Sequence, residues 1–184
     1  MPERDPDEAL VRRAQRGDRL AFERLVDRHQ HRLYTLAARV LGSPNDAADA
    51  VQEALLRAWL RLDRFRGEAR FSTWLYRICV NAAHDVRDRR RETAGLDATE
   101  NEHPDVRDPF AERELSGDLQ RALEALEEPY RSAVVLADVL GCSYAEIAEI
   151  MEVAEGTVKS RVFRARIELA RRLGTREGGD ASNR

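Results

Sequence analysis

The chain has 184 residues, of which 42% are hydrophobic and 35% are charged, with only 10 glycines and 6 prolines. This length allows one domain or two small ones, and the composition favours helical bundles over fibrous or disordered chains. The formal net charge of −3 argues against tight binding to nucleic acid without a partner, because proteins that bind it unaided usually carry a basic total.

Several other classes are also excluded. No apolar run approaches the roughly 20 residues that a membrane-spanning helix needs, and the acidic start MPERDPDEAL lacks the apolar segment of a signal peptide. Cys79 and Cys142 form no CxxC pair, and the four histidines are scattered. We therefore expect a cytoplasmic protein with reduced thiols, no metal site and no cofactor.

Helical periodicity fills the first half of the chain. Apolar residues recur at spacings of three and four over residues 18–41, and Gly42 ends this pattern. A Ser-Pro pair then starts a second helix over about 44–62. After a loop at 63–70, a third helix is predicted over about 71–91.

The second of these helices carries polar side chains off its apolar stripe, among them Asp49, Gln52 and Glu53. Such a row of acids is most simply a solvated face. The alternative is that this face docks on a basic partner surface.

The third helix has two faces. Its apolar stripe comprises Phe71, Trp74, Leu75, Ile78 and Ala82. The other face carries Arg70, Thr73, Arg77, Asn81, His84 and Asp88 at the same spacing. That face is suited to following a phosphate backbone and bonding an unstacked base, and the preceding loop FRGEARF is suited to holding an extruded base. Core packing explains Phe71 and Trp74 as well as a DNA role does. A histidine placed like His84 is more often a solvated surface residue, whereas Asn81 favours a functional role.

Residues 92–114 differ in composition from the rest of the chain. They hold eight Asp or Glu against two Arg, with two prolines and no helical period, which predicts a flexible acidic linker. The predicted organisation is all-α, with a first helical domain at 1–91, a second at 115–173 and a disordered tail at 174–184.

Four helices are predicted in the second domain, over about 113–126, 129–140, 144–151 and 155–173. The last two have the pattern of a helix-turn-helix. Ser143 and Glu146 form a capping box at its start. The buried stripe of the last helix comprises Val158, Val162, Ala165 and Leu169.

Four side chains of the last helix project away from that stripe: Lys159, Ser160, Phe163 and Arg164. The segment 153–173 holds six Lys or Arg against two Glu. An outward phenylalanine is unusual, but in a DNA groove it can contact a thymine methyl group while the basic residues reach bases or phosphates. The plain alternative is a helical hairpin with a solvated basic face.

Together these motifs resemble a known family. DAADAVQEALLRAWLRLDRFRGEARFSTWLYRICVNAAHD is similar to region 2, and SYAEIAEIMEVAEGTVKSRVFRARIEL to region 4, of bacterial extracytoplasmic-function (ECF) RNA polymerase sigma factors. The resemblance covers roughly 18–91 and 115–173. It implies a protein that is not an enzyme, that binds core RNA polymerase and promoter DNA, and that is commonly held inactive by a cognate anti-sigma factor.

The resemblance also implies roles for individual residues. The residues that match the family's polymerase-clamp-binding helix are Asp49, Gln52 and Glu53. In the −10 surface, which captures flipped non-template bases, the residues implied by the resemblance are Phe65, Arg66, Gly67 and Phe71 of the loop, and Asn81. The two faces of the third helix add Trp74, Arg77 and His84 to this surface. The match to the helix that reads −35 duplex DNA comprises Lys159, Ser160, Phe163 and Arg164. The sequence departs from the family pattern at Ala154, just before the last helix, where the family often has Ser, Thr or Pro. Alanine is a poor N-cap, so this departure weakens the expected start of that helix.

Two other classes remain open on the residues alone. A free-standing dimeric helix-turn-helix regulator would use its first domain as a sensor, although the sequence shows no dimer seam or effector pocket. An enzyme acting on nucleic acid needs a positioned nucleophile or clustered carboxylates. The acids of this chain are instead spread along helix surfaces.

Overall fold

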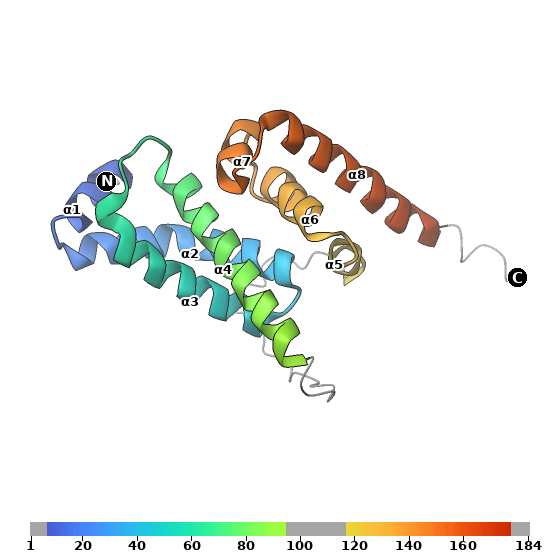
Figure 1. Cartoon of the computed structure of the whole chain (residues 1–184), viewed down its shortest axis with the longest axis horizontal. Coiled ribbons are helices and arrows are strands. Elements are labelled where there is room, and N and C mark those ends of the chain that lie inside the picture. The colour runs from blue at the N-terminus through green and yellow to red at the C-terminus, as the bar shows by residue number, and fades with distance from the viewer. Residues whose placement is uncertain (1–6, 95–116, 178–184) are drawn as a thin grey trace, which may run out of the picture.

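The computed structural model describes residues 7–94 and 117–177, and every regular element within these ranges is helical. The first domain contains α1 (Asp7–Ala14), α2 (Arg19–Leu41), α3 (Pro44–Arg61), the 3-10 turn η1 (Leu62–Arg64) and α4 (Phe71–Ala94). The second contains α5 (Gly117–Glu124), α6 (Glu128–Val134), the π-helical turn η2 (Val135–Val139), α7 (Tyr144–Met151) and α8 (Glu155–Glu177) (Figure 1). The all-α prediction is confirmed.

Local capping interactions explain the boundaries of α2 and α3. Asp18 is the N-cap of α2 and accepts a hydrogen bond from the Ala21 amide at 3.1 Å. Gly42 ends α2 with a φ of 73°, in the left-handed region that favours glycine. Ser43 caps α3 by accepting from the Asp46 amide at 3.3 Å. The predicted stop signal at Gly42 and the predicted N-cap at Ser43 are therefore confirmed, and the N-cap at Asp18 adds to them.

Two elements differ from the sequence prediction. Helix α1 was not predicted, because its buried side consists only of Leu10, Val11 and Ala14, too few residues for a periodic signal. The helix predicted over 129–140 is divided between α6 and η2, where the Leu140 amide bonds the Val135 carbonyl five residues earlier at 3.1 Å. Such π turns are rare insertions into helices.

Two predicted boundaries also move. Helix α4 continues to Ala94, into the predicted linker, and α8 continues to Glu177, so residues 174–177 are helical rather than part of a disordered tail. The remainder of the linker and tail predictions lies outside the described residues.

The two domains pack against each other through α4 and α2. Helix α4 contacts α2 and α3 and also α7, while α2 contacts α5, α6 and η2 (Figure 1). The buried side chains of both domains form one continuous apolar cluster that includes Leu33, Leu75 and Leu136. Within the described ranges, no helix combines the length and the apolar character required to cross a membrane.

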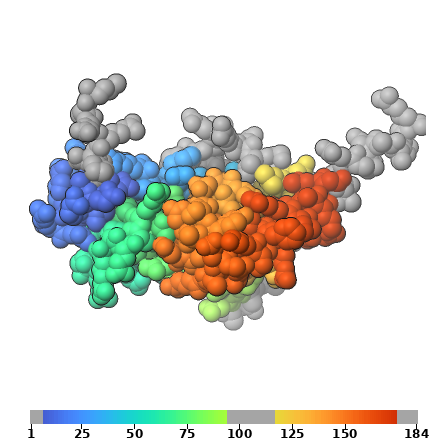
Figure 2. Space-filling view, turned by 90° about the horizontal axis from the view of Figure 1, so that it is seen from above, coloured from blue at the N-terminus to red at the C-terminus, as the bar shows by residue number. Residues whose placement is uncertain are grey.

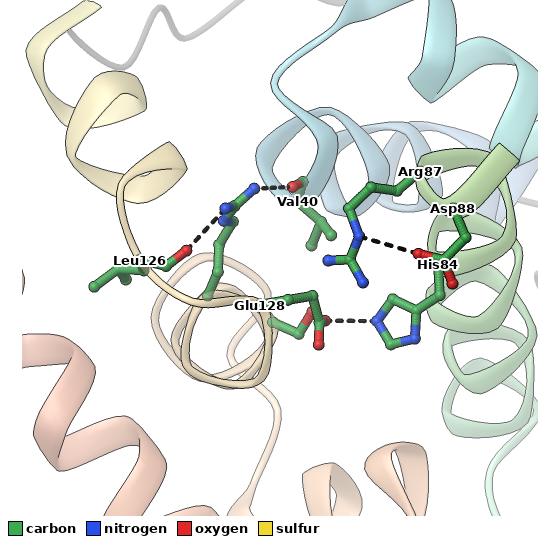
Figure 3. A network of polar contacts seen from close by, with 8 residues as sticks. Val40, His84, Arg87, Asp88, Leu126 and Glu128 are labelled. Atoms are coloured by element: carbon green, nitrogen blue, oxygen red, sulfur yellow. Dashed lines mark hydrogen bonds and ion pairs between the residues drawn. The ribbon is translucent and has the colours of Figure 1, made fainter. Parts of the chain in front are cut away.

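Polar contacts close the same interface. Arg131 of α6 donates to the carbonyl of Val40 in α2 at 2.6 Å and to that of Leu126 at 2.8 Å (Figure 3). Arg32 of α2 donates to the Leu140 carbonyl at 2.9 Å. These arginines satisfy carbonyls at the ends of helices, which have no intrahelical partner.

Candidate DNA and polymerase interfaces

Three aromatic rings gather at the base of the loop 65–70, which joins η1 to α4. The ring centroid of Phe65 lies 5.1 Å from that of Trp74 and 5.8 Å from that of Phe71. Phe65 and Trp74 are half-buried, whereas Phe71 is buried. In this arrangement Phe71 supports the other two rings and presents no open face, as the core-packing interpretation of this residue expects.

The tip of the same loop is open. Gly67 has a φ of 75°, and no atom lies within 4 Å of the place where a Cβ would stand. The neighbouring Arg66 has 83% of its side chain exposed. A glycine in the left-handed region lets the chain turn back tightly, so the loop forms a projecting arm beside the aromatic cluster.

Helices α3 and α4 form a hollow of about 260 Å³ next to this cluster. Three of the predicted −10 residues line it: Trp74, Arg77 and Asn81. Three arginines that were not predicted line it as well: Arg57, Arg61 and Arg64. Guanidinium groups beside an aromatic ring suit the phosphates and bases of an unpaired strand. The spacing of Arg57 and Arg61, four residues apart on α3, was the available sequence signal.

The polar face predicted for α4 is only partly exposed. Asn81 is exposed, but Thr73 is 4% exposed and belongs to the core, so its assignment to that face was wrong. Arg77 lies 3.6 Å from the Glu152 carboxylate of the second domain. His84 is half-buried, with its Nε2 2.5 Å from an oxygen of Glu128 in α6 (Figure 3).

The environment of Glu128 favours its ionised form. Burial, the largest influence, raises its pKa, but hydrogen bonds from His84 and Ser132, together with the charges of His84 and Arg87, outweigh burial. The pKa of Glu128 is therefore held below the usual range of a glutamate. The contact between α4 and α6 is consequently made by a carboxylate with hydrogen-bonding partners.

A groove of about 830 Å³ separates the loop 65–70 from the helix-turn-helix. Three arginines and one acid of the first domain line one side (Arg64, Arg66, Arg77 and Glu68), and Glu149 and Glu152 line the other. Figure 2 shows the two segments side by side, with the α3–α4 connection in green and α7 in orange. Acidic side chains of the second domain thus stand opposite the basic side chains of the proposed −10 surface.

The helix-turn-helix begins with the predicted capping box. The Ser143 hydroxyl accepts from the Glu146 amide, and the Glu146 carboxylate accepts from the Ser143 amide at 2.8 Å. These bonds from the Ser143 amide and hydroxyl lower the pKa of Glu146. Glu152 ends α7 with a φ of 54°. The start of α8 is formed despite Ala154, whose carbonyl accepts from the Thr157 amide at 2.9 Å.

Helix α8 has the two faces that the sequence indicates. Val158, Val162 and Ala165 are buried and Leu169 is half-buried, which confirms the apolar stripe. The four residues predicted to read DNA are all exposed: Lys159, Ser160, Phe163 and Arg164. Phe163 is 65% exposed. A ring of this size is normally buried, so its exposure marks the face of α8 that is available to a partner.

A third surface lies on α3. Asp49 and Gln52 are exposed, and Glu53 is held by Arg57 at 2.8 Å. All three of the predicted polymerase-binding residues line a shallow hollow of about 330 Å³, together with Leu56 and Arg89. Leu56 is 54% exposed and adds an apolar contact that the sequence analysis missed.

Both cysteines are free. Cys79 is buried, and burial raises the pKa of its thiol to about 12. Cys142 is half-buried, and burial, helped by the charge of Glu146, raises its pKa to about 11. Thiols that stay protonated at neutral pH are poor nucleophiles, as expected for core or near-core residues.

Comparison with known proteins gives matches over both domains. The family model for Sigma-70 region 2 matches residues 25–93, and that for Sigma-70, region 4 matches residues 116–169. The ECF RNA polymerase sigma-E factor of Escherichia coli strain K12 is 41% identical over 179 residues, covering 90% of this chain and 93% of that protein. The protein of the same name from Haemophilus influenzae is 40% identical, covering 90% of this chain and 94% of that protein.

Solved structures give the same result. The sigma factor RpoE from Bartonella quintana, in complex with the anti-sigma factor NepR, is 30% identical with a TM-score of 0.70, covering 83% of this chain and 96% of that one. CnrH, in complex with the cytosolic domain of CnrY, is 29% identical with a TM-score of 0.69, covering 93% of this chain and 99% of that one.

A helical domain that matches region 2, joined to a helix-turn-helix domain that matches region 4, defines a sigma-70-type initiation factor. Within that class, the chain belongs to the ECF RNA polymerase sigma factors. It is therefore not an enzyme: it binds core RNA polymerase, recognises promoter DNA and directs transcription initiation. The free-standing regulator is not favoured.

Proposed function

We propose that this sigma factor divides promoter recognition between two surfaces. In region 2, the loop 65–70 and α4 capture unpaired non-template bases of the −10 element. The residues assigned to this task are Phe65, Arg66, Gly67, Trp74, Arg77, Asn81 and His84, and the buried Phe71 supports the rings of Phe65 and Trp74 from behind. The observation that carries the assignment is the arginine-lined hollow beside the Trp74 ring, because it joins a stacking surface to groups that neutralise phosphates. Arg61 and Arg64 contact the phosphate backbone of the same unpaired DNA strand.

In region 4, α8 enters the major groove of the −35 element. Lys159 and Arg164 donate to base edges or phosphates, Ser160 bonds either, and Phe163 contacts an apolar base edge. Their shared exposure on the face opposite Val158 and Val162 supports this assignment.

Helix α3 binds the polymerase. The exposed carboxylate of Asp49, the exposed amide of Gln52 and the half-buried Glu53 line one hollow with the apolar side chain of Leu56. A surface of this kind fits a basic partner with an apolar centre. Because bacterial RNA polymerase acts in the cytoplasm, this is where we place the protein.

The arrangement of the two domains has to open before DNA binds. Arg77 and His84 are engaged by Glu152 and Glu128 of region 4, so a promoter strand competes with these carboxylates. A cognate anti-sigma factor that holds the two domains together would keep the protein inactive. The related sigma factor RpoE was solved in complex with the anti-sigma factor NepR, and the related protein CnrH was solved in complex with the cytosolic domain of CnrY.

Run-off transcription tests this function. Genomic DNA is transcribed by core polymerase with the wild-type protein or with no sigma factor, and discrete new transcripts are expected only with the protein. Asp49→Arg serves as the negative control, and Glu23→Arg, at an exposed position of α2, serves as the matched charge change elsewhere. Absence of new transcripts from a protein that still binds core polymerase would refute the proposed promoter recognition.

A further inference from the structure

Gln15 follows α1 directly and lies outside the segment that matches region 2. Its side-chain amide nitrogen donates to two backbone carbonyls of a distant segment, that of Leu62 at 2.9 Å and that of Phe65 at 2.8 Å. A side-chain amide has two hydrogens, and both are used on one short stretch of chain. That stretch is η1 and the first residue of the loop 65–70, where the proposed −10 surface begins.

The two carbonyls lie where α3 ends. The last carbonyls of a helix lack an intrahelical partner, and a single 3-10 turn has poorer hydrogen-bond geometry than an α-helix. The Leu62 carbonyl accepts from the Phe65 amide at 3.1 Å, and Gln15 supplies a second donor to the same oxygen. Phe65 leaves the turn with a φ of −72° and a ψ of 114°. The bond from Gln15 to its carbonyl therefore fixes the direction in which the loop departs.

Helix α1 is itself anchored to the first domain by three buried side chains: Leu10, Val11 and Ala14. At its other end, Asp7 accepts from Arg28 at 2.9 Å and lies 2.8 Å from the Nε2 of His29. The His29 ring meets the Phe71 ring edge-on at 5.5 Å. Helix α1 thus supports both ends of the loop 65–70. Gln15 bonds the carbonyls at the start of the loop, and Asp7 bonds His29, whose ring packs on Phe71 at the end of the loop.

We propose that Gln15 is a positioning residue for base capture. By holding the carbonyls of Leu62 and Phe65, it keeps the Phe65 ring and the following loop in the shape that receives an unpaired −10 base. This inference rests on the proposed function of residues 65–71. Gln15 lies on neither α3 nor α8, so its loss affects affinity for the captured base and leaves polymerase binding and −35 binding unchanged.

The test compares Gln15→Met, which keeps the length of the side chain and removes both donors, with the wild type. Holoenzyme assembled from core polymerase and the full chain is titrated with single-stranded non-template oligonucleotides. These span the −10 element of a promoter mapped by run-off transcription, and an abasic site is moved through them one position at a time. We expect Gln15→Met to bind the intact oligonucleotide about tenfold more weakly, the scale of lost hydrogen bonds. With the captured base removed, variant and wild type should bind equally.

Two further variants control for stability and for charge. Arg16→Met introduces the same side chain at the next exposed position and should bind as the wild type does. Gln15→Glu replaces the donors by acceptors and should show the same selective loss as Gln15→Met. Circular dichroism and the affinity for core polymerase establish that each variant is folded.

The outcomes separate the inference from the function on which it depends. If Gln15→Met loses affinity equally for intact and abasic oligonucleotides, Gln15 acts on stability alone and the inference is overturned. The inference is also overturned if Gln15→Met binds the intact oligonucleotide as tightly as the wild type does. Both results leave the loop as a base receptor, provided that the wild type distinguishes the intact oligonucleotide from an abasic one. If the wild type makes no such distinction at any position, the proposed base capture fails and the inference fails with it.

Discussion

The His84 imidazole and the Glu128 carboxylate lie 2.5 Å apart and join α4 of region 2 to α6 of region 4 (Figure 3). Glu128 also accepts from the Ser132 hydroxyl at 2.6 Å, and only 16% of its side chain is exposed. A residue assigned to the −10 surface is thus engaged within the protein. This pair links the stability of the closed arrangement to pH.

Glu128→Gln should destabilise the protein at neutral pH. Because the pKa of Glu128 is lowered in the folded state, its ionised form contributes stability above the ordinary glutamate pKa, and this contribution is lost as the pH falls through the lowered value. We expect a loss of about 1.5 kcal/mol in unfolding free energy at pH 7, typical of a hydrogen bond to a charged group. Denaturant unfolding at a series of pH values should show the difference shrinking below pH 4.5.

The exposed neighbour Glu127 supplies the control for this experiment. Glu127→Gln makes the same change outside the pair and should remain within about 0.5 kcal/mol of the wild type at every pH. A difference between wild type and Glu128→Gln that does not vary with pH would contradict the ionised pair as its cause.

Asn81→Ala and Arg164→Ala should impair different steps of initiation. Arg164 lies on α8 and should contribute to −35 duplex binding, so its loss should weaken closed-complex formation by about 1–3 kcal/mol. Asn81 lies in the hollow beside Trp74 and should act after the strands separate. Footprinting on duplex promoter and permanganate reactivity of unpaired thymines measure the two steps separately. Equal loss of the same step by both variants would show that the division of labour is wrong.

Asp49→Arg should weaken binding to core polymerase without unfolding the protein. The side chain is exposed on α3, where substitutions usually change stability by less than about 0.5 kcal/mol. Reversing the charge places a cation against the basic surface that we expect on the polymerase, which is unfavourable. Competition with a second sigma factor for limiting core polymerase measures this affinity. The same substitution at Asp27, an exposed position on α2, should leave it unchanged.

The sequence predicts those parts of the fold that depend on neighbouring residues. Gly42, Ser43 and Ser143 mark helix ends because a cap acts within one turn. The stripe from Val158 to Ala165 was predictable for the same reason, since one helix face is defined by spacing alone. Local patterns therefore determine most of the helices and the exposed face of α8.

Contacts between distant segments were not predictable in this way. The spacing assigns Thr73 to a polar face, but α4 packs on α3, on α2 and also on α7. The exposed surface of α4 is therefore smaller than expected for a helix that buries a single apolar stripe. The pairing of Arg77 and His84 with glutamates of region 4 depends on how the domains meet. Gln15 reaches carbonyls 47 and 50 residues away, and no periodicity reports such a contact.

Ser143→Ala tests whether the capping box stabilises α7, the first helix of the helix-turn-helix. The substitution removes the acceptor for the Glu146 amide and one of the bonds to the Glu146 carboxylate, which should lower the unfolding free energy by about 1 kcal/mol. The Ser143 amide, which the substitution keeps, is the largest cause of the lowered pKa of Glu146, and the Ser143 hydroxyl adds to it. The part of the difference that comes from the lost hydroxyl bond to the carboxylate should therefore be present above the ordinary glutamate pKa and fall as the pH is lowered through the depressed value. Thr93→Ala, which removes an exposed hydroxyl bonded to the Arg89 carbonyl, should change stability by less than about 0.5 kcal/mol. Denaturant unfolding measures both variants, and a Ser143→Ala protein as stable as Thr93→Ala would mean that packing of α7 on α4 and α8 fixes this helix without its cap.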